Sequence, residues 1–357
     1  MKKSVILPLL FLLFLVVPVQ SQSNLSVVLE TAPTAGQIGP DRTFAKTRLR
    51  VVDATGQTVP NAYLKFHLDA PPANALISTD FPIVEDTPLL EYAGPLPDGI
   101  FEFDYIYPIR GTYIFAIEAG RDASTLTYKD SLKLKLSENR NEVLNFVFFA
   151  FILLGLGIAT GFIIGRGARA QRMVAASLAL LLGLTLVSGS TFTAQAHGGG
   201  DVSSVKPFSQ QNTNGDLTLS YSMNPGAGRV GTLNHLNLTA TNGSGQLVPN
   251  TTFEVTLWHI EDEKPVFATT LIAPTGAADL EFQFFDGAEH EVRLVASNPA
   301  GTVDLTRVVE VEGLSPPLPV KIKTMVYLVG LVLAGILIGL RLQVVRAKTL
   351  EVVPVGA

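Results

Sequence analysis

The chain has 357 residues, of which 47% are hydrophobic and only 16% charged, and its mean hydropathy is +0.34. This composition is too apolar for one ordinary soluble protein and too polar for a polytopic carrier, so we expect membrane anchors joined to globular domains of roughly 100 residues each. The net charge of -5 without a basic stripe argues against a nucleic-acid partner, and the absence of cysteine excludes disulfides, thiolate metal sites and cysteine nucleophiles.

The N-terminus has the plan of a secretory signal peptide, which we place at residues 1–21. Lys2 and Lys3 precede a short apolar run, and Val19-Gln20-Ser21 offers a small-residue cleavage site. A retained N-terminal anchor is the alternative interpretation. Both interpretations export the segment that follows.

Residues 24–138 show short alternating apolar and polar runs, which predict half-buried strands. The predicted strands are 25–29, 48–52, 63–68, 100–105, 113–117 and 131–136. Turns rich in Gly, Pro and Asp separate them, because Gly accepts a positive φ, Pro fixes φ and Asp hydrogen-bonds its own backbone. We therefore predict a first β-sandwich domain outside the cytoplasm.

Two uncharged apolar runs flank a short basic segment in the middle of the chain. We predict transmembrane helices over residues 143–165 and 173–192, because a bilayer core needs about 20 apolar residues. The segment between them, 166–172, contains three arginines and is predicted to be a cytoplasmic hinge, since Lys and Arg are retained on that side during insertion. Residues 166–196 also have the plan of a second signal sequence.

After this hairpin, residues 197–215 are polar and glycine-rich, which predicts a flexible linker. Residues 216–313 resume the strand pattern and predict a second extracytoplasmic β-sandwich domain, with strands expected at 217–221, 236–240, 253–258, 280–284 and 291–295. A proline-rich riser then leads to a third predicted transmembrane helix over 323–340. Basic residues follow this helix, which places the tail, 341–357, in the cytoplasm.

The two β regions look like copies of one unit. The turn at Pro33 recurs at Pro225, and Gly-Gln-Thr-Val-Pro-Asn at 56–61 recurs as Gly-Gln-Leu-Val-Pro-Asn at 245–250. The offset stays at about 190 residues, and self-similarity at a fixed offset indicates duplicated units. We therefore expect both domains to have the same strand order.

The segments that carry a family resemblance lie in the first β region. Gly56-Gln-Thr-Val-Pro-Asn61 is followed by Asp98-Gly-Ile-Phe-Glu-Phe-Asp-Tyr105 and by Pro108-Ile-Arg-Gly-Thr-Tyr-Ile-Phe115. This succession of turns and strands resembles bacterial immunoglobulin-like periplasmic domains of the YtkA-like, FixH-like and CopC-like group. The resemblance implies an immunoglobulin-like fold and, for many members, copper handling through His and Met ligands. The chain has only four methionines and His67 precedes Leu-Asp-Ala-Pro-Pro, so no ligand is carried over.

No catalytic or cofactor-binding residue is predicted, because the sequence has neither a Gly-x-Ser-x-Gly elbow nor a histidine in a recognisable catalytic motif. The sharpest metal candidate is His197. If signal peptidase cut after Ala196, the new α-amine and the imidazole would chelate one Cu²⁺. The alternative is an uncut span with His197 in the linker.

Two further sets of polar residues have ordinary interpretations. The acidic run Asp80, Glu85, Asp86 and Glu91 offers oxygen atoms for Ca²⁺ but lacks the spacing of an EF-hand, which favours a solvated loop. The remaining histidines at 235, 259 and 290 lie on or beside predicted strands, and we interpret them as surface or strand residues.

Small residues recur every fourth position in the first and third predicted spans. Gly157, Gly161 and Gly165 form one stripe, and Gly335 and Gly339 form another. Such stripes let helix backbones approach closely, so these five glycines are predicted to pack the helices together. No span contains a buried charged residue, which argues against an ion or proton pathway.

These observations predict a mainly β protein with transmembrane α-helices: two immunoglobulin-like β-sandwich domains plus a three-helix membrane anchor. We expect it in a bacterial inner membrane, with the β domains in the periplasm or outside the cell. The leading hypothesis is a non-enzymatic binding or scaffold protein without a cofactor, whose partners are the lipid bilayer and a protein or cell-envelope component. Two tethered modules would gain avidity. The alternatives are a copper-handling protein using His197 or domain histidines, and an exported hydrolase.

Overall fold

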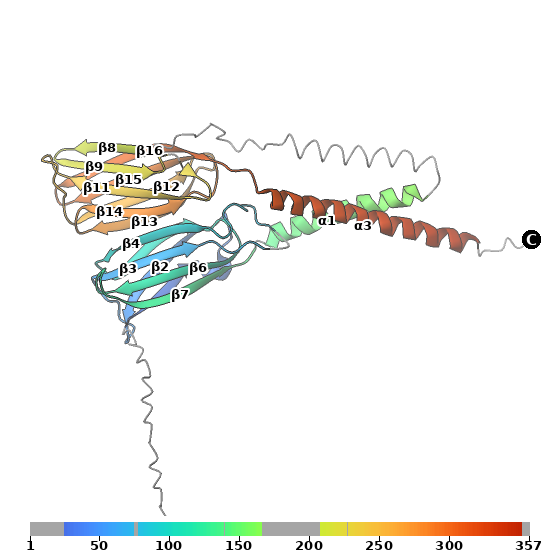
Figure 1. The fold of residues 1–357 in the computed structure, drawn as a ribbon, viewed down its shortest axis with the longest axis horizontal. Coiled ribbons are helices and arrows are strands. Elements are labelled where there is room, and N and C mark those ends of the chain that lie inside the picture. The colour runs from blue at the N-terminus through green and yellow to red at the C-terminus, as the bar shows by residue number, and fades with distance from the viewer. Residues whose placement is uncertain (1–24, 75–77, 139, 166–207, 227, 352–357) are drawn as a thin grey trace, which may run out of the picture.

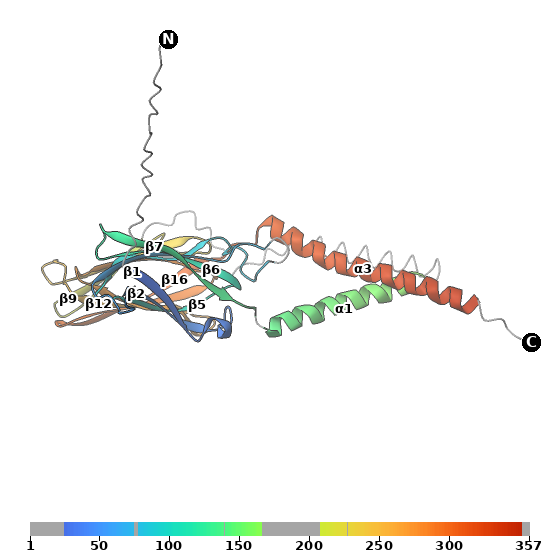
Figure 2. The same cartoon turned by 90° about the horizontal axis from the view of Figure 1, so that it is seen from below.

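A computed structural model describes residues 25–74, 78–138, 140–165, 208–226 and 228–351. Two β domains lie side by side, and two long helices project from the same end of them (Figures 1 and 2). We refer to residues 25–138 as domain 1 and to 208–313 as domain 2. Together the two domains form the β body.

Domain 1 consists of seven strands and a short 3-10 turn. The strands are β1 (Leu25–Ala32), β2 (Phe44–Asp53), β3 (Ala62–Asp69), β4 (Pro88–Leu96), β5 (Ile100–Ile106), β6 (Gly111–Gly120) and β7 (Leu126–Leu136), and the turn η1 (Ala35–Gln37) follows β1. Alternate residues of these strands are buried, as in β3, where Leu64, Phe66 and Leu68 face the core. The three-stranded layer β1-β2-β5 packs on the four-stranded layer β7-β6-β3-β4.

Domain 2 repeats this arrangement and adds two strands. Its strands are β8 (Phe208–Asn214), β9 (Leu217–Asn224), β10 (Gly228–Arg229), β11 (Leu233–Thr241), β12 (Thr251–His259), β13 (Lys264–Ala273), β14 (Ala277–Gln283), β15 (Glu289–Asn298) and β16 (Gly301–Glu312). The layer β9-β11-β14 corresponds to β1-β2-β5, and β16-β15-β12-β13 corresponds to β7-β6-β3-β4. Both domains therefore have the same immunoglobulin-like strand order.

The two domains share both of their sheets. Sheet I has the order β1-β2-β5-β13-β12-β15-β16-β10, and sheet II has the order β7-β6-β3-β4-β14-β11-β9-β8. In sheet I, Tyr105 of β5 lies opposite Phe267 of β13, and in sheet II, Leu90 of β4 lies opposite Phe282 of β14. The β4–β5 hairpin of domain 1 thus pairs with the corresponding β13–β14 hairpin of domain 2. In each pair, the first strand of one hairpin lies beside the second strand of the other: β4 beside β14, and β13 beside β5. This reciprocal pairing has the form of a two-fold symmetric interface within one chain.

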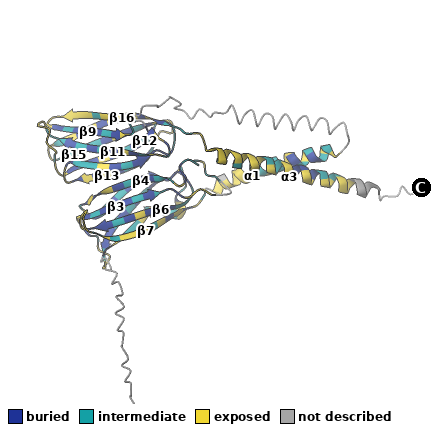
Figure 3. Cartoon of the chain, viewed as in Figure 1, coloured by how far each residue is buried: buried dark blue, intermediate teal, exposed yellow. Residues whose placement is uncertain are grey.

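One hydrophobic core runs through both domains. At the junction, the Phe267 and Phe282 ring centroids are 5.0 Å apart, and the Tyr105 ring meets Phe282 edge-on at 6.1 Å. All three side chains are fully buried. Because aromatic packing continues across the boundary, the β body is one packed unit, as its continuous buried layer in Figure 3 shows.

Local turns follow the same chemistry in both copies. The Asp53 carboxylate accepts hydrogen bonds from the Thr55 and Gln57 backbone amides, and the Asn242 side chain does the same for Ser244 and Gln246. Asn61 and Asn250, at φ 53° and 55°, then start the next strands. Asn tolerates this left-handed conformation better than most residues do.

The two described helices are α1 (Arg140–Ile164) and α3 (Leu318–Glu351). Residues Val143–Ile164 and Leu318–Arg346 are long and apolar enough to cross a membrane, by length and composition. Their apolar side chains are largely exposed outside the contact between the helices (Figure 3). α3 begins five residues before the predicted span, since Pro319 is tolerated in a first helical turn.

Five predictions differ from the structure or lie outside it. The predicted anchor has three helices and the described residues contain two, because the middle span at 173–192 lies outside the described residues. So do the signal peptide at 1–21, the hinge at 166–172 and His197. Part of the predicted linker is wrong: residues 208–214 form β8.

Strand β8 forms because its polar residues have partners at the end of the sandwich. A tight turn at Gly215, with φ +65°, returns the chain onto β9. The Asn214 amide donates to the Thr302 carbonyl at 2.8 Å, and the Arg307 guanidinium lies 4.0 Å from the Phe208 ring centroid. A polar edge strand of this kind is invisible to a search for apolar alternation.

Candidate functional site

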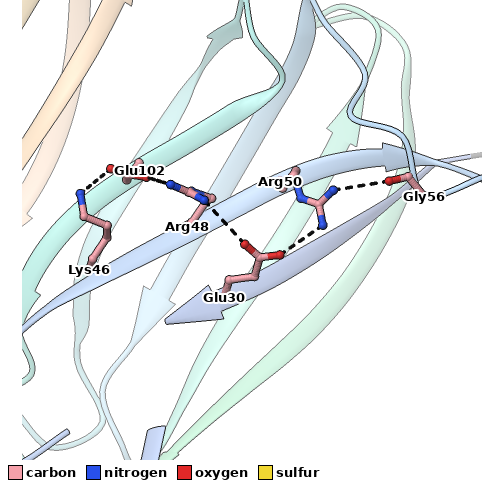
Figure 4. A network of polar contacts seen from close by, with 6 residues as sticks. All are labelled: Glu30, Lys46, Arg48, Arg50, Gly56 and Glu102. Atoms are coloured by element: carbon pink, nitrogen blue, oxygen red, sulfur yellow. Dashed lines mark hydrogen bonds and ion pairs between the residues drawn. The ribbon is translucent and has the colours of Figure 1, made fainter. Parts of the chain in front are cut away.

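The outer face of sheet I carries a line of ion pairs on domain 1, which we call the charge ladder. Its members are Glu30, Lys46, Arg48, Arg50, Glu102 and Asp104, on β1, β2 and β5. Figure 4 shows all of them except Asp104. Glu102 is the centre: its carboxylate oxygens lie 2.5 Å from Lys46 Nζ and 2.6 Å from Arg48 Nη2. The ladder contains three cations and three carboxylates, so this face is charged but internally neutralised.

Electrostatics inside the ladder favour the ionised forms. The hydrogen bond from Lys46 lowers the pKa of Glu102 below its ordinary value, with Arg48 acting in the same direction. The same hydrogen bond raises the pKa of Lys46. The side chains are one-third to one-half exposed, so solvent screens these pairs and each stabilises the fold only modestly.

A cleft lies beside the ladder, across the junction of the domains. Lys46, Arg48, Glu102 and Asp104 line it from domain 1. From domain 2 it is lined by Glu254, Thr256 and the strand segment 268–272. The Thr269 hydroxyl donates to the Glu102 carbonyl at 2.8 Å, which fixes the two walls against each other. The lining combines the charged side chains of the ladder with apolar residues such as Leu96 and Phe101, which suits a polar macromolecular surface better than an apolar small molecule.

The corresponding face of domain 2, on sheet II, repeats the ladder with weaker partners. His235 Nε2 lies 3.1 Å from Asp279 and its Nδ1 lies 3.3 Å from Glu281. Asn237 donates to Asp279 at 2.8 Å. By strand register, His235 and Asn237 occupy the positions that Lys46 and Arg48 occupy in domain 1. The acidic positions are thus retained, while the permanent cations are replaced by a titratable and a neutral group.

His67 is part of a second carboxylate–imidazole group. Its Nδ1 lies 2.6 Å from Glu91, and its Nε2 lies 2.6 Å from Asp69. The two carboxylates meet opposite nitrogens of the ring, so no single ion would contact all three side chains. Accordingly, no cluster of three His, Cys, Asp or Glu residues within the described parts of the chain fits a metal ion.

The acidic run predicted as a solvated loop has structural roles. Glu85 is buried and accepts hydrogen bonds from the Thr79 amide and hydroxyl at 2.8 Å. Asp86 accepts from the Ala73 amide at 3.0 Å, and Glu91 belongs to β4 rather than to a loop. These carboxylates are used by the protein itself because they satisfy backbone donors of an irregular segment.

The five glycines predicted to pack helices lie in the contact between α1 and α3. A Cβ atom added to Gly157 would lie 2.9 Å from the Cα atom of Gly335, and one on Gly161 would overlap the backbone of Ile336. Gly165 faces Gln343, and Gly339 faces Ile158. Both helices run away from the β body and approach each other toward their far ends (Figure 2). By contrast, Gly155 on α1 has no atom within 4 Å of an added Cβ.

His259 and His290, predicted as surface or strand histidines, are strand residues but not surface ones. They are 3% and 1% exposed and lie opposite each other on β12 and β15. A signal was present in the sequence: His259 continues the buried alternation of Phe253, Val255 and Leu257. A histidine at a strand position that continues the buried alternation is expected to point into the core.

No protein-family model and no curated protein sequence matches the chain. Among solved structures, it is similar to a β-glucuronidase of Parabacteroides merdae, with 14% identity over 32% of this chain and 13% of that chain, and a TM-score of 0.19. It is similar to an α-2-macroglobulin from Escherichia coli, with 7% identity over 80% of this chain and 16% of that chain, and a TM-score of 0.22. It is also similar to a segment of two fibronectin type III domains from chicken tenascin, with 8% identity, coverage of 80% and 97%, and a TM-score of 0.17.

The chain therefore spans only 13% and 16% of the length of the first two of these structures. At these identities and TM-scores the likenesses carry no argument about activity, substrate or partner. The immunoglobulin-like fold follows from the strand order of each domain. The comparisons lend no support to the narrower resemblance to the YtkA-like, FixH-like and CopC-like group.

Proposed function

We propose that the protein is a membrane-anchored, non-enzymatic scaffold that presents a rigid β body outside the cytoplasm. The observation that carries this proposal is the pairing of both sheets across the domain junction. A body whose sheets and core run through two domains offers one fixed surface, including the polar cleft beside the charge ladder. A fixed surface binds a partner without first paying the entropy of ordering it.

This arrangement changes the expected use of the duplication. Two modules on flexible tethers gain avidity by binding independently. Here the β4–β5 and β13–β14 hairpins pair with each other, so the two domains present a single composite face. We infer that both domains descend from one unit, supported by their common strand order and by matching bulges after Leu68 in β3 and after Leu257 in β12.

For the anchor we propose that α1 and α3 cross a bacterial inner membrane together. The span in α1 contains 22 residues, and at 1.5 Å per residue this is close to the thickness of a hydrocarbon core. Both helices leave the same end of the β body, so both would enter the same membrane face (Figure 1). Arg341 and Arg346 near the far end of α3 favour a cytoplasmic location for that end.

Reporter fusions test this topology. Alkaline phosphatase joined after Lys135 or after Val311 should be active, since both positions lie in the β body. The same enzyme joined after Arg169 should be inactive, because that residue belongs to the proposed cytoplasmic hinge. Activity at Arg169 would overturn the orientation and with it the extracytoplasmic scaffold.

The binding face is tested by site-specific photo-cross-linking in living membranes. A photoreactive side chain replacing Thr270, which is exposed and lines the cleft, should give a discrete adduct with one partner. The matched control replaces Lys65, which is exposed on the outer face of sheet II in domain 1. Equal adducts at both positions, or none at Thr270, would contradict a role for the cleft.

A further inference from the structure

A pair of buried histidines closes the end of domain 2 from which the chain leaves for α3. The His259 and His290 ring centroids are 4.8 Å apart, with the rings nearly perpendicular at 82°. The His290 ring also packs on Phe284 at 4.9 Å. The pair therefore sits in apolar packing on one side and meets polar groups only at its outer rim.

The hydrogen bonds at this rim define which nitrogens carry protons. His290 Nδ1 lies 3.1 Å from the Ala288 carbonyl, which only accepts, so this nitrogen donates. His259 Nδ1 accepts from the Asp262 amide at 3.1 Å, and its Nε2 lies 3.4 Å from the Asp286 carboxylate. His290 Nε2 is left as the nitrogen that a further proton would occupy.

Charged groups surround the pair on every element packed against it, and most of them are acidic. The β12–β13 turn supplies Glu261, Asp262, Glu263 and Lys264, and the segment leading into β15 supplies Asp286 and Glu289. β10 and β16 supply Arg229 and Glu312. Domain 1 supplies Asp41 and Asp80. Lys264 is held by Asp262 at 2.9 Å and by Asp41 at 3.7 Å. Asp262 and Asp286 meet His259 at the rim, and His290 lies behind it.

The two histidines titrate in opposite directions. The hydrogen bond to Asp286 raises the pKa of His259. Burial lowers the pKa of His290 to about 4. The stability that His259 adds is complete once the pH is below the ordinary histidine value and is lost as the pH rises through its raised pKa. The stability that depends on neutral His290 is complete above the ordinary value and is lost as the pH falls from there towards about 4.

The segment beside the pair is the exit towards α3. The Ala288 carbonyl that accepts from His290 also accepts from the Val311 amide at 3.1 Å. The Ile260 amide donates to the Glu289 carbonyl at 3.1 Å, which ties the end of β12 to the same segment. A Cβ atom on Gly287 would overlap Gly313, so the two backbones are in direct contact. Any movement of residues 286–290 therefore displaces the last residues of β16.

We propose that this histidine pair is a proton-operated latch, closed with His290 neutral and opened in acid when His290 takes up a proton. A proton on His290 Nε2 places a second positive charge in apolar packing 4.8 Å from His259, and it is accommodated only if residues 286–290 move outward. That movement releases the Ala288–Val311 hydrogen bond and frees the exit segment from the β body. The latch acts on this chain alone and does not depend on the scaffold role.

Hydrogen exchange of the full chain in lipid nanodiscs tests the latch. Below pH 6 the His259 contribution is complete and only that of His290 changes. The opening measured at the Val311 and Ile260 amides should therefore rise roughly five- to tenfold between pH 6.0 and 5.0, after correction for the intrinsic exchange rates. The end of domain 1 near Tyr113, which is closed by Tyr107 and Tyr113 in place of a histidine pair, should show no comparable rise.

Two variants separate the latch from general acid lability. His290→Phe keeps an aromatic ring beside Phe284 but takes no proton, so the rise in opening should disappear. If that variant fails to fold, His290→Tyr serves instead, since tyrosine fills the corresponding position 113 of domain 1. The control variant, His67→Gln with His235→Gln, removes two outer-face histidines and should keep the rise. A rise that persists without His290, or no rise in the unmodified chain, would overturn the proposal.

Discussion

At the ends nearest the helices, the two domains fill corresponding positions with different chemistry. In domain 1 the Tyr107 and Tyr113 rings are 4.9 Å apart, and in domain 2 Phe284 and His290, at the corresponding positions of the strand register, are also 4.9 Å apart. The Tyr113 hydroxyl donates to the Ile109 carbonyl and accepts from the Ile109 amide. Domain 1 thus closes this end with a neutral phenol, whereas domain 2 closes it with an imidazole.

The outer faces of the two domains also differ in the groups that hold their carboxylates. Domain 1 holds its carboxylates with Lys46 and Arg48, which stay charged at every ordinary pH, whereas domain 2 uses His235 and Asn237. The corresponding outer-face positions are therefore permanently charged in domain 1, whereas in domain 2 one is a histidine and the other is neutral. The lesson is that the alternation of apolar residues sets which face of each strand is buried, while the response to protons is set by a few polar positions that the alternation leaves open.

The largest expected effect comes from breaking the core of domain 1 and reading the result in domain 2. Phe66→Ala should cost about 3–5 kcal/mol, because Phe66 is 1% exposed and its ring packs among Tyr92, Phe101 and Phe115. Trp258, the only tryptophan, reports on domain 2. Since the sheets are shared, the denaturation midpoint from Trp258 fluorescence should fall together with the midpoint from circular dichroism.

The control for this experiment is Lys65→Ala, which changes the exposed neighbour of Phe66 and should leave both midpoints in place. A Trp258 transition that stays unchanged in Phe66→Ala would show that the domains unfold separately. It would also remove the single observation on which the rigid scaffold rests.

Alternation in the sequence was sufficient to predict β5 and β14 at the junction, but it missed the two strands that pair with them across it. The stretches at 63–68, 100–105 and 253–258 lie within β3, β5 and β12. The hairpin strands β4 and β13 were missed, because Glu91 and the proline-rich end of β4 look like a loop. Apolar spacing reports which face of a strand is buried and not which edge it pairs with. The sharing of both sheets therefore could not be read from the sequence.

The candidate sites were predictable to different degrees. The glycine stripes are visible in the sequence because small residues recur every fourth position on one helix face. The charge ladder depends on Glu102 of β5 lying opposite Arg48 of β2, and this register is fixed only in the folded sheet. The histidine pair unites β12 with β15, two strands that the sequence separates by the β13–β14 hairpin.

An intermediate effect is expected in the helices, where each domain supplies one member of the pair. Gly161→Leu should separate α1 from α3, because even a methyl group there overlaps the Ile336 backbone. Overpacking of this kind costs about 1–3 kcal/mol. Spin labels on cysteines introduced at Leu156 and Leu337, which are exposed on the two helices, should report a longer distance in nanodiscs.

Gly155→Leu is the matched control in the same helix, since Gly155 has open space around an added Cβ. The distance should stay unchanged in that variant. Equal lengthening in both variants would attribute the effect to the larger side chain in the bilayer, and no lengthening in Gly161→Leu would contradict packing through the glycines.

The smallest effect sharpens the comparison of the two outer faces. Glu102→Gln should destabilise the β body by up to about 1 kcal/mol, because it removes the charge shared by Lys46 and Arg48 in partly exposed ion pairs. Asp279→Asn changes the corresponding carboxylate of domain 2, whose partners are His235 and the neutral Asn237, and at pH 8 it should cost less. Chemical denaturation at low and high salt measures both, and salt should reduce only the Glu102 effect.

The pH dependence of the Glu102 contribution has a definite sign. The hydrogen bond from Lys46 lowers the pKa of Glu102, so its contribution is present above the ordinary value of 4.5 and is lost as the pH falls through the lowered value. The difference between the unmodified chain and Glu102→Gln should therefore vanish in strong acid, and a difference that grows there would refute the ladder as an electrostatic device.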